Sequence, residues 1–142
     1  RMDFRELHNF HQETKADVTI AVLPVSQEQV SGFGIVQVDE TSKVHAFIEK
    51  PKTIEEIEPY AVSPEWLSKS GIHATNRPYL ASMGIYLFNR KALLDLLNSR
   101  PLATDFGKEI FPRSIKNYNV NFITSTTTIY SIIFRLSWSS IK

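Results

Sequence analysis

The chain's hydrophobic positions fall into segments of two alternating kinds. Residues 17–25 read DVTIAVLPV, a nearly continuous apolar run with many β-branched side chains. Such a run is typical of a strand that is buried on both faces, as in a sheet covered by helices. Residues 80–88, LASMGIYLF, have the same character. The pattern therefore predicts two buried strands.

A hairpin is predicted between these two strands. Residues 33–38 (FGIVQV) and 43–49 (KVHAFIE) flank the polar loop DETS at 39–42. Two short apolar segments around a polar loop indicate antiparallel strands joined by a turn. Apolar and mixed positions alternate along the second segment, which predicts one apolar face.

Segments before and between these strands have the periodicity of helices. Residues 4–14 form an amphipathic pattern, and Asp3 before them can cap the helix. Two short helices are expected around 53–58 and 64–70, in a stretch punctuated by prolines.

Two more helices are expected after the second buried strand. Asn89 can cap a helix that runs to about residue 98. We expect three of its leucines to face inward: Leu93, Leu94 and Leu97. Asp105 can cap a last short helix, which Pro112 would end or kink. The alternation of strands and helices favours an α/β fold with a mixed β-sheet flanked by helices.

Composition narrows the class of protein. The 142 residues fit one domain or a piece of one, and 42% hydrophobic with 22% charged residues is ordinary for a globular chain. The absence of cysteine excludes a disulfide scaffold, a thiolate zinc site and a cysteine nucleophile, and it suits a reducing compartment. A net charge of +1 argues against a nucleic-acid binder.

The two ends of the chain differ from its middle. The chain starts without a signal peptide, directly at the entry to a helix, so we expect that N-terminal sequence is missing. After Glu109 there is no acidic residue, and the segment 121–142 is rich in Ser, Thr and Ile. Its apolar run at 129–134 is too short to span a bilayer and indicates a strand or an aggregation-prone segment. We therefore expect a domain over 1–120 and an atypical tail over 121–142.

Glu49, Lys50 and Pro51 stand where the second hairpin strand leaves the sheet. The proline is expected to hold Lys50 in an extended conformation. A lysine there could neutralise a phosphate, and Glu49 could accept hydrogen bonds from sugar hydroxyls. On spacing alone, a solvated charged strand end is the more common explanation.

Three further positions could line a ligand site. Ser82 lies near the start of a buried strand and could bond a ligand hydroxyl, although a serine satisfied within the sheet is the simpler explanation. Gly84 and Gly34 could permit close backbone approach, or Gly34 could mark only a bulge. Asp105 could bond a substrate, but a helix cap explains it more simply.

The sequence gives less support to a histidine metal site, to kinase chemistry and to other catalytic motifs. His8 and His11 are spaced to share a metal on one helix face, but no third ligand is obvious and a polar helix surface explains them better. Asp105-Phe106-Gly107 matches the magnesium motif of kinases, yet the kinase Gly-rich loop and His-Arg-Asp motif are absent. No Walker loop or nucleophile-elbow motif occurs.

Four motifs in order resemble one family. They are residues 1–21 (RMDFRELHNFHQETKADVTIA), 33–51 (from FG to FIEKP), 81–88 (ASMGIYLF) and 104–112 (TDFGKEIFP). Together they resemble bacterial and plant glucose-1-phosphate adenylyltransferase, also called ADP-glucose pyrophosphorylase. The resemblance covers residues 1 to about 120.

The resemblance implies a Rossmann-like nucleotidyltransferase domain that joins ATP and glucose 1-phosphate into ADP-glucose and diphosphate, in glycogen or starch synthesis. It implies that Lys50 holds the sugar phosphate, that Glu49 binds glucose hydroxyls, and that Gly34, Ser82 and, more weakly, Asp105 line the same pocket. It also implies Mg²⁺, a homo-oligomer, and a bacterial cytoplasmic or a plastid location, with no nucleic acid or membrane as partner.

The chain also departs from that family. The Gly-rich nucleotide loop and the metal-binding aspartates are absent from these 142 residues, as is the C-terminal β-helix. No catalytic or metal residue is therefore assigned, and we expect the chain to be inactive alone. Two alternatives stay open. One is another sugar-1-phosphate nucleotidyltransferase that makes UDP-, dTDP- or GDP-sugars. The other is a non-catalytic remnant or partner of a full-length subunit.

Overall fold

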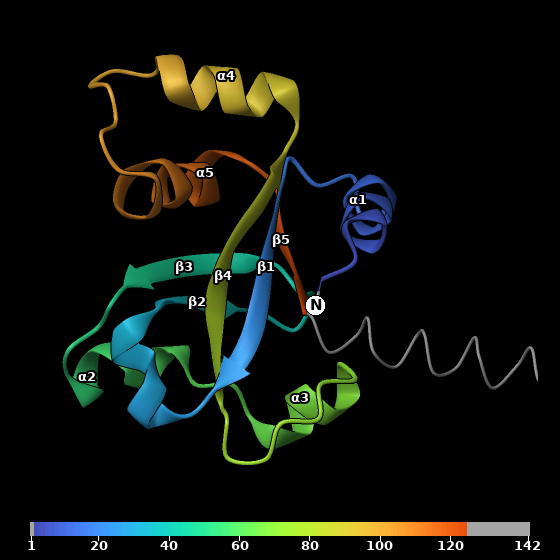
Figure 1. Ribbon diagram of the computed structural model, residues 1–142, viewed down its shortest axis with the longest axis vertical. Coiled ribbons are helices and arrows are strands. Elements are labelled where there is room, and N and C mark those ends of the chain that lie inside the picture. Colours follow the sequence, from blue (N-terminus) through green and yellow to red (C-terminus); the bar gives the residue numbers. More distant parts are fainter. Residues whose placement is uncertain (1, 125–142) are drawn as a thin grey trace, which may run out of the picture.

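The computed structural model describes residues 2–124, which form a five-stranded mixed sheet with helices on both faces (Figure 1). The strand order is β3-β2-β4-β1-β5, and β1 pairs parallel with β5, whereas the other pairings are antiparallel. The strands are β1 (Val18–Val25), β2 (Gly34–Val38), β3 (Val44–Glu49), β4 (Tyr79–Phe88) and β5 (Val120–Thr124). The α/β class and the mixed sheet predicted from the sequence are confirmed.

Helices and short helical turns connect the strands. The α-helices are α1 (Phe4–Glu13), α2 (Ile54–Ile57), α3 (Pro64–Lys69), α4 (Arg90–Asn98) and α5 (Phe111–Asn117). The shorter turns are η1 (Gln27–Gly32), η2 (Glu58–Tyr60) and the π-helical η3 (Phe106–Ile110). Within the described residues, each predicted strand and helix is thus present, with boundaries that differ by one or two residues, apart from the last helix. The strand indicated at 129–134 lies outside the described residues.

The predicted burial of the first strand on both faces is confirmed. Val18, Ile20 and Val22 pack with Phe111 of α5 in the main core. Ala21 points to the opposite face, where it packs with Leu7 of α1. Continuous burial on two sides explains why this segment is apolar at nearly every position.

Of the two effects predicted for Pro112, the ending of the last helix is wrong. The helical path begins at η3 and continues into α5, so Pro112 does not end it. The Phe111 amide bonds the Phe106 carbonyl, five residues back, and this widened turn directly precedes the proline, which has no N–H to donate. Pro112 therefore stands where π-helix gives way to α-helix.

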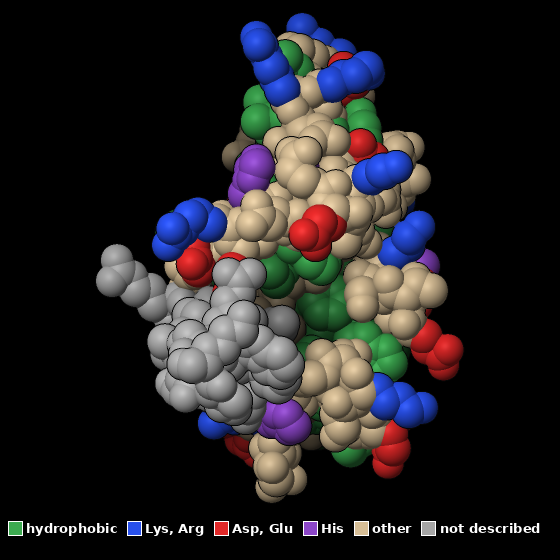
Figure 2. Space-filling view, turned by 90° about the vertical axis from the view of Figure 1, so that its right-hand side faces the viewer, with side chains coloured by type: hydrophobic (Ala, Val, Ile, Leu, Met, Phe, Trp, Pro, Cys, Tyr) green, Lys and Arg blue, Asp and Glu red, His purple; other side chains and the backbone are tan. Residues whose placement is uncertain are grey.

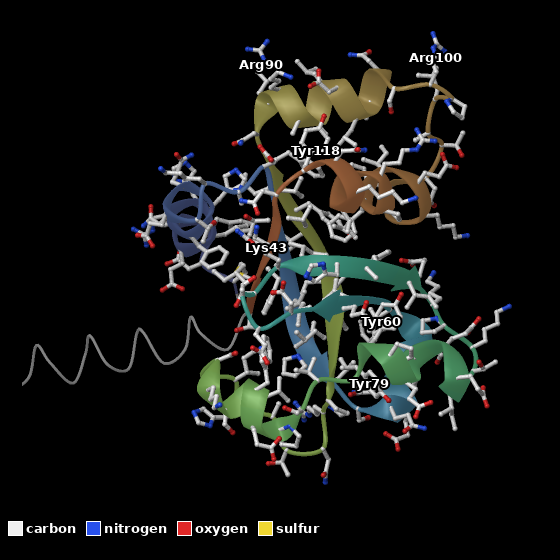
Figure 3. All side chains as sticks on the ribbon, turned by 180° about the vertical axis from the view of Figure 1, so that it is seen from behind. Lys43, Tyr60, Tyr79, Arg90, Arg100 and Tyr118 are labelled. Atoms are coloured by element: carbon white, nitrogen blue, oxygen red, sulfur yellow. The ribbon has the colours of Figure 1, made fainter. Side chains whose placement is uncertain are left out.

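The inward-facing leucines predicted for α4 are wrong at two of three positions. Leu94 and Leu97 are 45% and 44% exposed, whereas the buried residues are Ala92 and Leu96. Helix α4 lies at the outer end of the molecule, where it packs mainly against α5, so only a narrow stripe is covered (Figure 1). Lys and Arg side chains gather at this end (Figure 2), and the labelled Arg90 and Arg100 stand near its two ends (Figure 3).

The predicted cap of α4 is also wrong in its mechanism. Asn89 occupies the N-cap position, but its side chain makes no capping hydrogen bond. The side chain instead donates to the Ala16 carbonyl and accepts from the His11 ring, which fastens the start of α4 to α1 and the turn after it.

Candidate functional site

A cleft of about 570 Å³ opens at the end of the sheet where β2 begins and β3 ends. In Figure 1 the arrowhead of β3 marks this end, beneath α5. The middle of β4 forms another wall, and η3 covers the fourth side. The polar groups that line the cleft come from Glu49, Ser82, Tyr86 and Asp105. Four glycines also form part of its wall: Gly32, Gly34, Gly84 and Gly107.

Glu49 is half-buried at the last position of β3, directly opposite Gly34 of β2. Its carboxylate has no hydrogen-bond or ion-pair partner among residues 2–124. A Cβ atom built on Gly34 would lie 2.8 Å from Glu49 Oε2, and one built on Gly107 would lie 3.1 Å from it. The carboxylate therefore occupies the space that two missing side chains leave, and its acceptor oxygens remain free for a ligand.

Two hydroxyl groups meet on the β4 wall. Ser82 Oγ lies 3.2 Å from the Tyr86 hydroxyl and accepts a 3.1 Å hydrogen bond from the Gly84 amide. The pairing of β4 with β1 is interrupted here, because three residues of β4 (83–85) face only Ala21. Gly84 has a φ of +70°, which glycine adopts without strain, so it permits this bulge.

The environment of Tyr86 keeps its hydroxyl protonated. Burial raises the pKa of Tyr86, the Ser82 hydrogen bond lowers it, and the charges of Glu49 and Asp105 raise it further, so the net pKa is above its ordinary value of 10.0. A protonated hydroxyl can donate as well as accept, so the cleft holds both donors and acceptors.

Asp105 caps η3, which confirms the simpler of the two explanations given for it. Its Oδ1 accepts a 2.6 Å hydrogen bond from the Lys108 amide. The same side chain is exposed on the cleft wall, so capping does not remove it from a ligand's reach. The next residue, Phe106, packs its ring against Tyr86 and Phe88 and is 37% exposed, which gives the cleft an aromatic surface.

Lys50 lies at the rim of the cleft, beyond the end of β3. Its amide donates a 2.9 Å hydrogen bond to the Phe33 carbonyl, and its side chain is exposed. The predicted extended conformation is wrong, because Lys50 has a φ of +50°. A lysine in the left-handed region before a proline is strained, and such strain persists only where the surroundings impose it. Here the hydrogen bond to Phe33 and the paired end of the hairpin impose it.

The structure thus brings four of the five predicted site residues into one cleft (Gly34, Glu49, Ser82, Asp105) and leaves Lys50 at its rim. The sequence reasoning missed Tyr86, Phe106 and Gly107 as parts of the site. Phe106 and Gly107 directly follow a predicted site residue, and this adjacency could have identified them. Tyr86 gives no such signal, because only the bulge at Gly84 returns it to Ser82.

His8 and His11 do not form a metal site. His8 is exposed, whereas His11 is buried and bonds Thr19 at 2.8 Å and Asn89 at 3.0 Å through its two ring nitrogens. The predicted polar helix surface is therefore wrong for His11, which is a buried and satisfied histidine. Within residues 2–124, no group of three His, Asp or Glu side chains could hold a metal ion, and no helix is long and apolar enough to cross a bilayer.

Comparison with known protein families found one family whose range includes this cleft. A family model described as nucleotidyl transferase matches residues 1–139 of the chain. The matched range contains all five strands and every residue of the cleft. It also extends into the segment predicted as an atypical tail, of which residues 121–124 belong to β5 and the remainder lies outside the described residues. The predicted boundary at residue 120 stays a prediction.

Proposed function

The chain belongs to the nucleotidyl transferase family, and on this basis we propose that its cleft is the sugar-phosphate part of a glucose-1-phosphate adenylyltransferase site. Membership of this family supports an activity that transfers a nucleotidyl group. The sugar and the nucleotide are inferred from the cleft and from the motif resemblance described above.

The free carboxylate of Glu49 is the observation that carries the proposal. An ionised carboxylate only accepts hydrogen bonds, so a half-buried one without a donor favours a ligand that brings donors. Sugar hydroxyls are such donors. The nearby hydroxyls of Ser82 and Tyr86 can donate to, or accept from, further sugar hydroxyls. The ring of Phe106 offers an apolar surface for a sugar's C–H groups.

Lys50 completes the proposed site from its rim. In the reaction, a phosphate oxygen of glucose 1-phosphate attacks the α-phosphorus of ATP, and the bond from that phosphorus to the leaving diphosphate breaks. The chain's residues would act on the attacking partner. Lys50 would bind its phosphate with a compact positive charge, while Glu49 and Ser82 would hold the sugar and so orient that phosphate.

The family relationship implies Mg²⁺, but the described residues do not fit such an ion. Glu49 and Asp105 are the only carboxylates that line the cleft, and no third ligand joins them within residues 2–124. We therefore derive no step through the metal.

Ligand-dependent thermal unfolding tests the sugar-phosphate assignment. A ligand that binds only the folded chain raises its stability by mass action. We expect millimolar glucose 1-phosphate to raise the Tm, and glucose 6-phosphate to raise it much less. Lys50→Ala should abolish the shift. Lys52→Ala, which removes another exposed lysine two residues away, should retain it. Equal shifts with both sugar phosphates would overturn the assignment.

The nucleotide needs a separate test, since no residue of the cleft is assigned to the base. Because the chain is expected to be inactive alone, the test compares binding and not turnover: calorimetry measures its Kd for ADP-glucose, UDP-glucose, dTDP-glucose and GDP-glucose. Tightest binding of ADP-glucose would support the adenylyl assignment. Tightest binding of another nucleotide sugar would contradict it.

A further inference from the structure

Two glycines from different elements flank the carboxylate of Glu49. Gly34 begins β2, and Gly107 lies in η3, more than 70 residues later in the chain. We propose that Gly107 is a positioning residue: its missing side chain keeps the Glu49 carboxylate where it can accept hydrogen bonds from a sugar phosphate. The ligand named here rests on the proposed function. The packing relationship between Gly107 and Glu49 does not.

The distances point to Glu49 as the group that depends on Gly107. A Cβ atom on Gly107 would lie 3.1 Å from Glu49 Oε2 and 3.6 Å from its Cδ, whereas Asp105 Oδ1 would be 3.8 Å away. The first distance is shorter than ordinary van der Waals contact, and the other two are ordinary. A methyl group at residue 107 would therefore push the Glu49 carboxylate aside by a few tenths of an ångström and leave Asp105 in place.

A substitution of Gly107 by alanine should move the Glu49 carboxylate without destabilising the fold. Its backbone is not in the left-handed region, so alanine fits the same conformation. Alanine is favoured over glycine within helical turns, since it loses less backbone freedom on folding. Gly34 offers no such separation, because a Cβ there would collide with the Phe47 ring as well as with Glu49.

The first test compares Gly107→Ala with Gly71→Ala. Gly71 lies outside the cleft, and a Cβ there meets nothing within 4 Å. Titration calorimetry with glucose 1-phosphate should give a Kd about tenfold higher for Gly107→Ala, which corresponds to about 1.4 kcal/mol. The Kd of Gly71→Ala should match that of the unmodified chain, although the φ of +72° at residue 71 makes this variant less stable. The Tm of Gly107→Ala without ligand should not fall. An unchanged Kd for Gly107→Ala would overturn the proposal.

A second pair of variants asks whether Gly107 acts through Glu49. Glu49→Asp withdraws the carboxylate from residue 107 by one methylene group and keeps its charge. Gly107→Ala should then add no further loss of affinity in the Glu49→Asp background. Residues that act through one another show this non-additivity, whereas independent structural effects add. An additive loss would mean that Gly107 acts on the fold and not on Glu49.

A measurement without ligand distinguishes the failure of this proposal from failure of the proposed function. The carboxyl ¹³C signal of Glu49 should shift in Gly107→Ala and stay in place in Gly71→Ala. If the signal shifts but the unmodified chain binds no glucose 1-phosphate, the positioning role stands and the proposed function fails. If the chain binds glucose 1-phosphate but the signal and the Kd both stay unchanged, the positioning role alone fails.

Discussion

The hydroxyl groups of Ser82 and Tyr86 lie 3.2 Å apart although the two residues stand four positions apart along one strand. In a regular strand, positions four residues apart are separated by about 13 Å. The bulge around Gly84 removes this separation and turns both hydroxyls toward the cleft. An irregularity of one strand therefore creates a paired donor and acceptor at the candidate site.

Tyr86→Phe tests the value of this pair. The ring contacts with Phe106 and Phe111 should survive, because only the oxygen is removed. We expect a stability loss of about 1 kcal/mol, as for one neutral hydrogen bond. The Kd for glucose 1-phosphate should rise by about tenfold, since a buried donor to the ligand is lost. Urea unfolding and calorimetry measure the two effects.

Tyr118→Phe is the matched control for that variant. Tyr118 is labelled in Figure 3 and lies at the end of α5, outside the residues that line the cleft. The same chemical change there should leave the Kd for glucose 1-phosphate unaltered. Equal affinity of Tyr86→Phe and the unmodified chain would show that the Ser82–Tyr86 pair serves the fold only.

Substitutions of Lys50 should affect the stability of the chain and its ligand binding differently. Its φ of +50° costs a residue with a Cβ about 1–2 kcal/mol, whereas glycine adopts this conformation freely. Lys50→Gly should therefore be more stable than Lys50→Ala by about 1 kcal/mol in urea unfolding. Both variants should lose the Tm shift caused by glucose 1-phosphate, because both lose the ammonium group. A glycine variant less stable than the alanine variant would contradict the strained backbone.

Local signals in the sequence predicted the elements well. The apolar run of β1, the cap at Asp3 and the hairpin around residues 39–42 each depend on neighbours in the chain, and each is present. Glu49 stands at a strand end, where α/β folds bind ligands, but spacing alone favoured a solvated charge there and a serine satisfied within the sheet at Ser82. The resemblance to a family is what selected both residues. The fold class and four residues of the cleft could thus be predicted from the sequence.

The remaining features depend on partners that are distant in the sequence. Asn89 has the residue type of a cap, but His11, which is 78 positions away, engages its side chain. Leu94 and Leu97 match an inward stripe, but α4 packs mainly on α5 and leaves them exposed. Local patterns specify that a face is apolar, and they do not specify how much of it another element covers.

The His11 network should contribute to stability and not to binding. Asn89 Nδ2 donates to the Ala16 carbonyl, so Asn89 Oδ1 is the atom that accepts from His11 Nε2–H. In the neutral ring, Nδ1 then accepts from the Thr19 hydroxyl, which is fully buried. His11→Leu should cost about 2–3 kcal/mol in urea unfolding, because it leaves the Thr19 hydroxyl without its partner.

A second substitution and a control make that prediction specific. Thr19→Val added to His11→Leu should recover part of the loss, since replacing both partners of a buried hydrogen bond is far milder than removing one. His8→Leu, on the exposed side of α1, should change stability by less than about 0.5 kcal/mol. The Tm shift caused by glucose 1-phosphate should persist in all three variants. Loss of that shift would tie the network to the cleft.

The β2–β3 turn should give the protein a measurable acid sensitivity. The Asp39 carboxylate accepts from the Thr41 amide, the Thr41 hydroxyl and the Lys43 amide, and it also pairs with His45. Burial raises the pKa of Asp39, but the hydrogen bonds from His45, Thr41 and Lys43 outweigh it and hold the pKa well below its ordinary value of 3.8. The folded chain therefore releases this proton more readily than the unfolded chain.

A carboxyl group whose pKa is lower in the folded state stabilises the fold fully above its unfolded pKa, and this contribution is lost as the pH falls. Asp39→Asn keeps an acceptor oxygen for the Thr41 amide and removes the charge. The difference in unfolding free energy between the unmodified chain and Asp39→Asn should thus be constant above about pH 5 and shrink below about pH 4. Urea unfolding at intervals between these values and about pH 2.5 measures it. A difference that stays constant through this range would mean that the turn depends on the shape of residue 39 and not on its charge.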